Sequence, residues 1–384
     1  MNKNRVNVSL TAATMFADSK PHYALLDALR GVAALLVVFY HIFEGFSFAG
    51  GGVITTINHG YLAVDFFFML SGFVLAYAYD DRWKTTLTTA GFIRRRLIRL
   101  HPMIVIGAII GMITFIIQGR VQWDGTTVAF GAIIVALIAG MCLIPAIPGG
   151  YYEVRGAGEM YPLNGPSWSL FFEYIGNLVY ALFLRRLSDK MLLGVVVLTG
   201  ICFGWFAIAD VSGYGMIGVG WTLDGMNFIG GFLRMIFPMS FGMLLSRKFR
   251  PVRVKGAFWI CTLTLIILFC VPFLNKWNGV YEFCCIALIF PMLVWLGASA
   301  SESKAMPRFY KFLGDISYPL YAIHYPLMYL FFSWLLEAEQ HAPGETWAVA
   351  IVTYMGSVLL AYICLKCYDI PVRKRLSRIF IRKE

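Results

Sequence analysis

Long apolar runs, each near the length of a bilayer-spanning helix, restrict the fold of this 384-residue chain more than any other feature. A helix needs about 20 mostly apolar residues to cross the roughly 30 Å hydrocarbon core of a bilayer. Eleven such runs occur, at about 25–44, 61–79, 103–118, 127–146, 167–184, 191–209, 228–245, 257–275, 280–298, 316–336 and 347–366. The sequence therefore predicts an all-α fold, a polytopic transmembrane helical bundle.

The composition favours this class over a soluble one. Hydrophobic residues make up 59% of the chain and charged residues 14%, whereas soluble domains are about 45–50% apolar and about 25% charged. A β-barrel would show short alternating segments instead of long apolar runs. The first 20 residues have no apolar core, so we expect no cleavable signal peptide.

Basic residues are concentrated at the ends of apolar runs, which explains the net charge of +11 without a nucleic-acid partner. They lie mainly in 80–102, 185–190, 246–256, 299–315 and the tail after 366, whereas 45–60, 210–227 and 337–346 contain no Lys or Arg. Cytoplasmic loops of membrane proteins are enriched in these residues. About ten spans with both termini inside place every basic segment in the cytoplasm, provided that the run 127–146 does not cross. We expect that run to be re-entrant or interfacial.

One membrane domain (1–384) is expected, with a short cytoplasmic N-terminus (1–24) and a basic cytoplasmic tail (367–384), in the inner membrane of a bacterium. The eight cysteines fall nearly all within apolar runs and are interpreted as buried free thiols. Cys364 and Cys367 form a lone CxxC, which is weak evidence for metal or redox chemistry.

The first apolar run carries charged residues on one helical face. Eleven positions separate Arg30 from His41, close to three whole turns, so both lie on one face roughly 16 Å apart along the axis. Asp27 lies one turn before Arg30 on the same face. A charge near the bilayer centre costs about 2.5–3.5 kcal/mol, so these groups indicate a functional site inside the membrane.

Six motifs together resemble one family. They are Arg30 with His41, GYLAVDFFFMLSGFVLAY (60–77), FIRRRLIRLHP (92–102), NGPSWSLFFE (164–173), FLRMIFPMSFGMLL (232–245) and ISYPLYAIHYPL (316–327). In this order they resemble acyltransferase family 3, a family of integral membrane proteins. The resemblance implies ten spans, and transfer of an acyl group, usually acetyl from acetyl-CoA, to a hydroxyl of a sugar or another extracytoplasmic acceptor.

His41 is the expected catalytic base, because imidazole accepts protons near neutral pH and a free hydroxyl is a poor nucleophile. Arg30 is expected to orient a carbonyl or phosphate, with a structural pair to Asp27 as the alternative. Asp65, at the start of the second span, is expected beside His41, where a carboxylate would fix the imidazole tautomer. Glu173 is expected to support His41 or to bind acceptor hydroxyls, and a structural hydrogen bond to a neighbouring helix is the alternative.

Arginines are expected to hold the acyl-CoA donor. Arg95, Arg96 and Arg99 lie in a cytoplasmic segment, and arginine forks suit phosphate groups. Arg96 and Arg99 are neighbours on a helix face and match the paired arginines of the family. Contact with lipid head groups also explains a basic segment. Arg234, inside the sixth span, needs a ligand or a buried carboxylate, and we count it among the donor-binding residues.

A polar stripe on the ninth span is expected to bind substrate. Ser317 and His324 are seven residues apart on one face, and Tyr321 lies beside them. A packed, hydrogen-bonded stripe without substrate is the alternative. Ser71 and Gly72 are interpreted as allowing close helix packing, since no nucleophile-elbow motif surrounds Ser71.

The interpretation is an acyltransferase in which cytoplasmic acyl-CoA meets an acceptor hydroxyl at His41, with no catalytic metal. A transporter is the rival from another class, with Arg234, Glu173, Asp65 and His324 lining a polar path. However, no inverted repeat is detectable in the sequence. A further alternative is the same chemistry at the cytoplasmic face, on a lipophilic secondary metabolite.

Overall fold

The computed structural model describes residues 23–49, 57–252, 254–299, 307–337 and 341–381. Most of the predicted N-terminal segment (1–22) and the last tail residues (382–384) lie outside the described residues. The helices are α1 (Ala24–Ala49), α2 (Ala63–Tyr79), α3 (Thr89–Ile117), α4 (Phe130–Met141), α5 (Ser167–Leu182), α6 (Asp189–Ile208), α7 (Gly225–Lys248), α8 (Ala257–Cys270), α9 (Asn278–Cys284), α10 (Phe290–Ala298), α11 (Pro307–Ile323), α12 (Tyr325–Glu337), α13 (Pro343–Cys364) and α14 (Ile370–Phe380).

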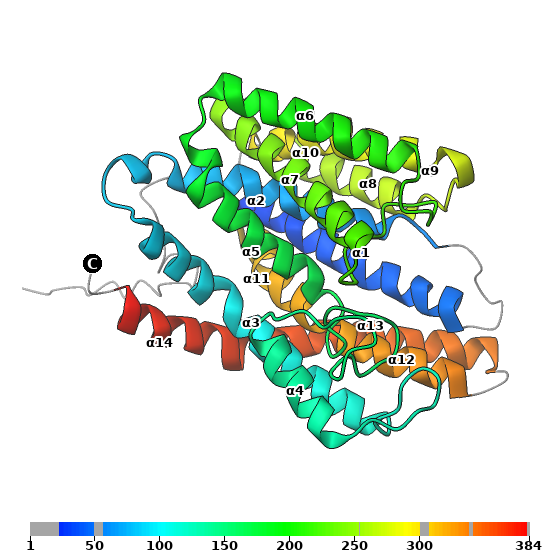
Figure 1. Cartoon of the computed structure of the whole chain (residues 1–384). Helices are drawn as coiled ribbons and strands as arrows, with labels where there is room; N and C mark the ends of the chain where they lie inside the picture. Colours follow the sequence, from blue (N-terminus) through cyan, green and yellow to red (C-terminus); the bar gives the residue numbers. More distant parts are fainter. Residues whose placement is uncertain (1–22, 50–56, 253, 300–306, 338–340, 382–384) are drawn as a thin grey trace, which may run out of the picture.

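Eight helical segments of the described chain are long and apolar enough to cross a membrane. They comprise α1, α2, α3, α5, α6 and α7, together with α9–α10 and α13–α14, each pair joined by a π-helical turn. These segments run alongside one another in a single bundle (Figure 1). The predicted polytopic helical membrane bundle is therefore confirmed.

Two apolar helices are shorter than a bilayer. Helix α4 has 12 residues and measures about 18 Å, which agrees with the prediction that its run does not cross. Helix α8 has 14 residues, fewer than the predicted run 257–275. Its end is explained by Pro272, because the residue before a proline is driven out of the helical region, and Val271 has ψ 128°.

A break at His324 divides the predicted ninth span into α11 and α12. Pro326 has no N–H, so it cannot bond the carbonyl of Ala322 four residues earlier. That carbonyl accepts a hydrogen bond from Asn164 Nδ2 at 2.8 Å instead. His324 Nδ1 lies 2.9 Å from the carbonyl oxygen of Tyr321. The break therefore turns the imidazole back onto α11 and fixes its position.

Glycines allow α2 and α7 to approach closely. A Cβ atom added at Gly72 would lie 1.9 Å from the carbonyl oxygen of Met239, and one at Gly242 would lie 2.1 Å from that of Met69. No side chain fits at either position. The predicted role of Gly72 in close helix packing is thus confirmed.

Several of the basic connections meet at one end of the bundle. Arg247, at the end of α7, binds Asp80 at 2.7 Å and donates to the carbonyl of Leu187 at 2.8 Å. Arg94, near the start of α3, donates to the carbonyl of Phe380 in α14 at 2.9 Å. We call this the basic end; it lies at the left of Figure 1, where α3 begins and α14 ends. Charges that the sequence assigns to one side of the membrane are therefore also together in space.

Candidate active site

A cavity lies between α1, α2, α3, α5 and α11. It contains about 740 Å³ of space between side chains, part of it open to solvent. The lining residues are Arg30, Val64, Phe67, Phe68, Ser71, Val74, Arg96, Arg99, Leu100, Ser169, Leu170, Glu173, Ser317, Tyr318 and Tyr321. Six of the predicted site residues are among them, namely Arg30, Arg96, Arg99, Glu173, Ser317 and Tyr321.

Arginines line the part of the cavity near the basic end. Arg30 lies six residues after the start of α1, about 9 Å along its axis, and its Nη1 donates to Asp27 Oδ1 at 2.9 Å. Arg99 is exposed and makes no ion pair with any described residue. Arg95, one of the predicted phosphate ligands, is not among the lining residues. Arg99 is therefore the arginine best placed to meet an anionic ligand.

An ion pair is built into the cavity wall. Glu173 Oε1 accepts hydrogen bonds from Arg96 Nη2 at 2.7 Å and from Ser71 Oγ at 3.0 Å. Both charged side chains are buried, with 8% and 10% exposed. The structural alternative for Glu173 is thus observed, while the pair still faces the cavity. Glu173 neutralises Arg96 and Asp27 pairs with Arg30, so Arg99 is the lining arginine that has no ion-pair partner among the described residues.

Tyr321 closes the inner end of the cavity. Its hydroxyl lies 2.5 Å from Ser169 Oγ, and Phe67 packs edge-on against its ring with 5.3 Å between ring centres. The ring of His324 lies 6.0 Å beyond Tyr321, and the ring of His41 lies 5.2 Å beyond that of His324. His41 therefore stands behind the inner end, two rings away from the cavity lining.

His41 forms a pair with a carboxylate that sequence analysis did not identify. His41 Nδ1 lies 2.6 Å from Glu44 Oε2, and the hydroxyls of Tyr40 and Tyr325 also donate to this carboxylate at 3.4 and 3.3 Å. A carboxylate at Nδ1 holds the proton on that nitrogen and leaves Nε2 as the basic atom. The signal that could have identified Glu44 is its i, i+3 spacing from His41, because residues at that spacing are neighbours on a helix.

Asp65, which we expected beside His41, binds Arg234 instead. Arg234 donates to both carboxylate oxygens at 3.1 and 2.7 Å, and to the carbonyls of Val219 and Tyr61 at 3.1 Å each. The two side chains are 1% and 0% exposed. Of the two alternatives predicted for Arg234, a ligand or a buried carboxylate, the carboxylate is observed. Neither residue lines the cavity, so the geometry favours a structural pair over the catalytic and donor-binding roles predicted for them.

The two predicted residues at the ends of the ninth-span stripe differ in position. Ser317 lines the cavity, and its hydroxyl donates to the carbonyl of Gly314 at 2.9 Å. His324 is fully buried behind Tyr321, and its Nε2 has no hydrogen-bond partner among the described residues. An unsatisfied buried polar atom is uncommon in native proteins. His324 Nε2 is therefore a free acceptor close to His41.

A second polar cluster adjoins His41 through Tyr325, whose ring lies 4.7 Å from that of His41. The hydroxyl of Tyr329 donates to both carboxylate oxygens of Glu159 at 2.9 and 2.8 Å. The guanidinium of Arg155 lies 3.4 Å from the centre of the Tyr329 ring. We call Glu44, Arg155, Glu159, Tyr325 and Tyr329 the outer cluster. Two of its members belong to the connection between α4 and α5, which folds over α12 (Figure 1). That connection has no helical or strand period, so sequence analysis did not identify it.

Glu159 gives the protein a specific pH dependence. Burial raises the pKa of Glu159 to about 7, although Arg155 and the hydrogen bond from Tyr329 act to lower it. The unfolded chain ionises this group near 4.5, so the free energy of unfolding falls as pH rises from there through 7. Glu159→Gln keeps an acceptor for Tyr329 and should remove this loss. We expect its melting temperature, relative to wild type, to increase between about pH 5 and about pH 8. An equal difference at both pH values in thermal unfolding would contradict this expectation.

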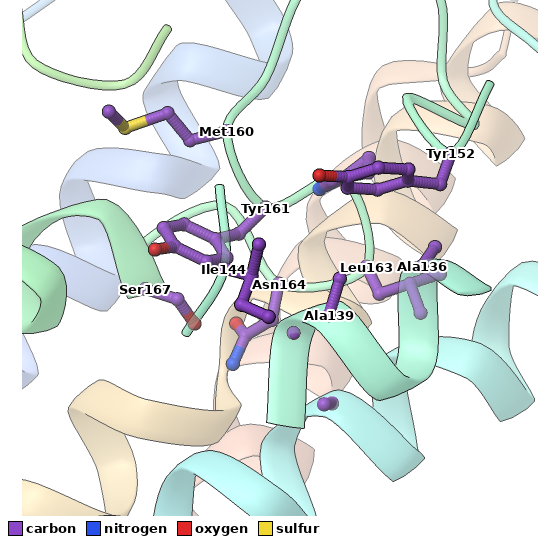
Figure 2. A pocket seen from close by; sticks show the side chains of 12 residues that line it. Ala136, Ala139, Ile144, Tyr152, Met160, Tyr161, Leu163, Asn164 and Ser167 are labelled. Atoms are coloured by element: carbon purple, nitrogen blue, oxygen red, sulfur yellow. The ribbon is translucent and has the colours of Figure 1, made fainter. Parts of the chain in front are cut away.

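A smaller hollow lies between α3, α4 and the same connection (Figure 2). It contains about 280 Å³ of space, and small side chains such as Ala136 and Ala139 form one wall. Asn164 lines it with an Oδ1 that has no partner among the described residues. The hollow contains no predicted site residue, and its mainly apolar wall offers little for acyl transfer chemistry.

Among the described residues, neither the cysteines nor the other metal-ligating side chains form a second site. All eight cysteines are free, as predicted, but only Cys261, Cys285 and Cys364 are buried. The prediction of burial is wrong for the exposed ones because an apolar membrane helix also presents a lipid-facing side. Within the described ranges, no group of three or more His, Cys, Asp or Glu side chains is placed to hold a metal ion.

Comparison with known proteins gives one family and three relatives. A family model of an acyltransferase domain matches residues 23–366. Protein 2 in the picA locus of Rhizobium radiobacter is 32% identical over 191 residues, covering 47% of this chain and 91% of that protein. Acyltransferase MdmB of Streptomyces mycarofaciens is 34% identical over 172 residues, covering 42% and 38%. Peptidoglycan O-acetyltransferase OatA of Listeria monocytogenes is 24% identical over 381 residues, covering 93% and 56%. The match thus spans less than two thirds of the last two proteins, and no solved structure matches significantly.

Proposed function

The chain belongs to acyltransferase family 3, and from this premise we propose that it transfers an acyl group, acetyl in the simplest case, from acyl-CoA to a hydroxyl of a sugar or similar acceptor. The cavity is the observation that carries the proposal. It brings together six predicted residues from four helices, and its inner end stands two rings from an imidazole paired with a carboxylate.

We place the basic end in the cytoplasm, in a bacterial inner membrane. Lys and Arg concentrate at cytoplasmic ends of membrane helices, and α14 ends beside the start of α3 at this end. Acyl-CoA is a cytoplasmic metabolite, so the donor would enter where Arg30 and Arg99 line the cavity. His41 lies seventeen residues into α1, about 26 Å from the basic end. The acceptor would therefore arrive from the opposite side.

Arg99 is the residue on which we place the donor phosphates. Coenzyme A carries a pyrophosphate and a 3′-phosphate, and an arginine fork binds phosphate with two parallel hydrogen bonds. Arg99 is exposed and free of any described ion-pair partner, whereas Arg96 is held by Glu173. Arg30, predicted near the reacting groups, lies roughly 16 Å from His41 along α1, which suits donor binding better than catalysis.

Arg99→Ala is expected to raise the KM for acetyl-CoA by about tenfold, the loss of one hydrogen bond to a charged group. The KM for acetyl-pantetheine, which lacks the nucleotide phosphates, should stay unchanged. Arg95→Ala is the matched control, since Arg95 lies outside the cavity lining. Steady-state kinetics with both donors check this. An equal effect on the two donors would remove Arg99 from the phosphate site.

We propose a direct transfer in which His41 acts as the base. His41 Nε2 takes the proton of the acceptor hydroxyl, and the oxygen attacks the thioester carbonyl carbon. The new C–O bond forms as the C–S bond breaks, and the thiolate of coenzyme A receives the proton. Glu44 holds Nδ1 at 2.6 Å and stabilises the imidazolium that forms on the way.

The transporter alternative has less support from the structure. Its polar path required Arg234 and Asp65, which satisfy each other and lie outside the cavity lining. The deciding experiment is acetyl-CoA turnover by the purified protein, measured as thiol release with and without cell-envelope glycans. Thiol release that depends on acceptor supports the proposal. If monodisperse protein shows neither thiol release nor coenzyme A binding, the proposed function is overturned.

A further inference from the structure

A wall of side-chain rings separates the donor cavity from the proposed base. The cavity lining includes Tyr321 but neither His324 nor His41. The ring of His324, which is fully buried, lies 6.0 Å from that of Tyr321, and the ring of His41 lies 5.2 Å from that of His324. A general base acts within hydrogen-bond reach, about 2.6–3.2 Å. A thioester in the cavity therefore does not meet His41 while the Tyr321 ring stays in this position.

Uncharged contacts hold the Tyr321 side chain in place. Its hydroxyl lies 2.5 Å from Ser169 Oγ on α5, and Phe67 on α2 packs edge-on against its ring with 5.3 Å between ring centres. A hydrogen bond between neutral groups contributes less than one that involves a charge. The cavity beside the ring offers space for it to turn into. The Tyr321 ring can therefore leave Ser169 without breaking an ion pair of the cavity wall.

His324 connects this ring to the side of the wall on which His41 lies. His324 Nδ1 lies 3.0 Å from the carbonyl oxygen of Leu320 and 2.9 Å from that of Tyr321. Nδ1 therefore carries the hydrogen and Nε2 is an acceptor, yet Nε2 has no partner among the described residues. A ligand beside His41 that donates to Nε2 would act on the same imidazole that holds the last turn of α11. Binding on the His41 side thus has a direct route to Tyr321.

Water on the His41 side makes such a wall useful. The side chains of His41 and Glu44 are 14% and 31% exposed, so water reaches the proposed base. A base that activates an acceptor hydroxyl also activates water. Attack of that water on the thioester carbonyl carbon forms a C–O bond, breaks the C–S bond, and yields the free carboxylic acid and the coenzyme A thiol. This hydrolysis consumes the donor without an acylated product, and a closed active site prevents such side reactions.

We propose that Tyr321 sets the selectivity for acceptor over water, by keeping the donor thioester away from His41 until an acceptor is bound there. This inference rests on the proposed function. Ser169 holds the ring in the closed position, and His324 links the ring to the acceptor side. Tyr321 is thus a positioning residue, because it determines which nucleophile meets the thioester and does not itself take part in the bonds that change.

Hydrolysis of acetyl-CoA by the full-length protein without acceptor tests this selectivity, with thiol release as the readout. Tyr321→Ala should release thiol about 10²-fold faster than wild type, the lower end of what a general base contributes. Adding His41→Ala should remove that gain, because the attacking water then lacks its base. Coenzyme A affinity and melting temperature, measured on the same samples, show that the donor site and the fold persist.

Conservative variants keep the test decisive if Tyr321→Ala does not fold. Tyr321→Phe and Ser169→Ala each remove the bond between the two hydroxyls, so each should raise hydrolysis by about fivefold, the effect of one neutral hydrogen bond. Tyr161→Phe and Ser240→Ala are the matched controls. Their hydroxyls bond to backbone carbonyls at 2.9 and 3.0 Å, outside the cavity lining, so hydrolysis should stay at the wild-type rate.

The outcomes separate this inference from the proposed function. Hydrolysis that Tyr321→Ala raises, and that the added His41→Ala removes, supports the role of Tyr321. Acetyl transfer by wild type, together with a folded Tyr321→Ala that hydrolyses no faster, overturns that role and leaves the acyltransferase standing. A gain that the controls share, a gain that survives loss of His41, or unchanged hydrolysis in both conservative variants where Tyr321→Ala does not fold overturns it too. Absence of thiol release and of coenzyme A binding in wild type and every variant would overturn the proposed function, and this inference with it.

Discussion

Replacing His41 with alanine should lower acyl transfer by about 10²–10⁴-fold, the range expected for removing a general base. Donor binding should persist, because the cavity lining does not include His41. The fold should persist as well, since the His41 and Glu44 side chains are 14% and 31% exposed and water can replace the lost partner. Thiol release in the presence of acceptor, coenzyme A affinity and melting temperature measure the three effects separately.

Two further variants test whether the charge of Glu44 supports His41 as the base. Glu44→Gln keeps an acceptor for His41 Nδ1 but removes the charge, so we expect a smaller loss of kcat than in His41→Ala. Tyr40→Phe removes a long 3.4 Å hydrogen bond to the same carboxylate and should have little effect. If His41→Ala retains full thiol release, His41 is not the base and the direct-transfer mechanism fails.

Six of the predicted site residues line one cavity. Arg30, Glu173 and Tyr321 come from helices far apart in the chain, yet all three line it. They meet there because a charged or hydrogen-bonding side chain within an apolar run is more stable in the protein interior than in lipid. The membrane class followed from the same physics, because long apolar helices are stable when lipid surrounds them.

Partners across helices were harder to predict. Asp65 and Glu173 are both carboxylates within apolar runs, and nothing in the sequence states which of them meets Arg234 from α7. The packing of α2 on α7, set by backbone approach at Gly72 and Gly242, decides this. The break at His324 has a local signal by contrast, namely Pro326, although we predicted one continuous run over 316–336. The outer cluster depends on the irregular connection between α4 and α5, whose sequence has no helical or strand period from which its fold could be predicted.

Substitutions in the Asp65–Arg234 pair distinguish a structural role from the catalytic and donor-binding roles that the sequence suggested. Asp65→Ala leaves a guanidinium that is 1% exposed without its counter-charge, and breaking a buried pair in this way costs about 3–5 kcal/mol of the free energy of unfolding. Asp80→Ala, which breaks a pair with 14% and 21% exposed side chains, should cost much less. Unfolding of the purified variants measures both.

The double variant Asp65→Leu/Arg234→Met provides the decisive comparison. Removing both charges leaves no buried ion, so it should be more stable than either single variant, although Val219 and Tyr61 lose a donor to their carbonyls. If the pair is structural, the double variant also recovers coenzyme A binding along with its fold. A stable double variant that cannot bind coenzyme A would return Arg234 to the donor site. A double variant no more stable than Asp65→Ala would show that the carbonyl hydrogen bonds of Arg234, and not its charge, hold α7 against α2.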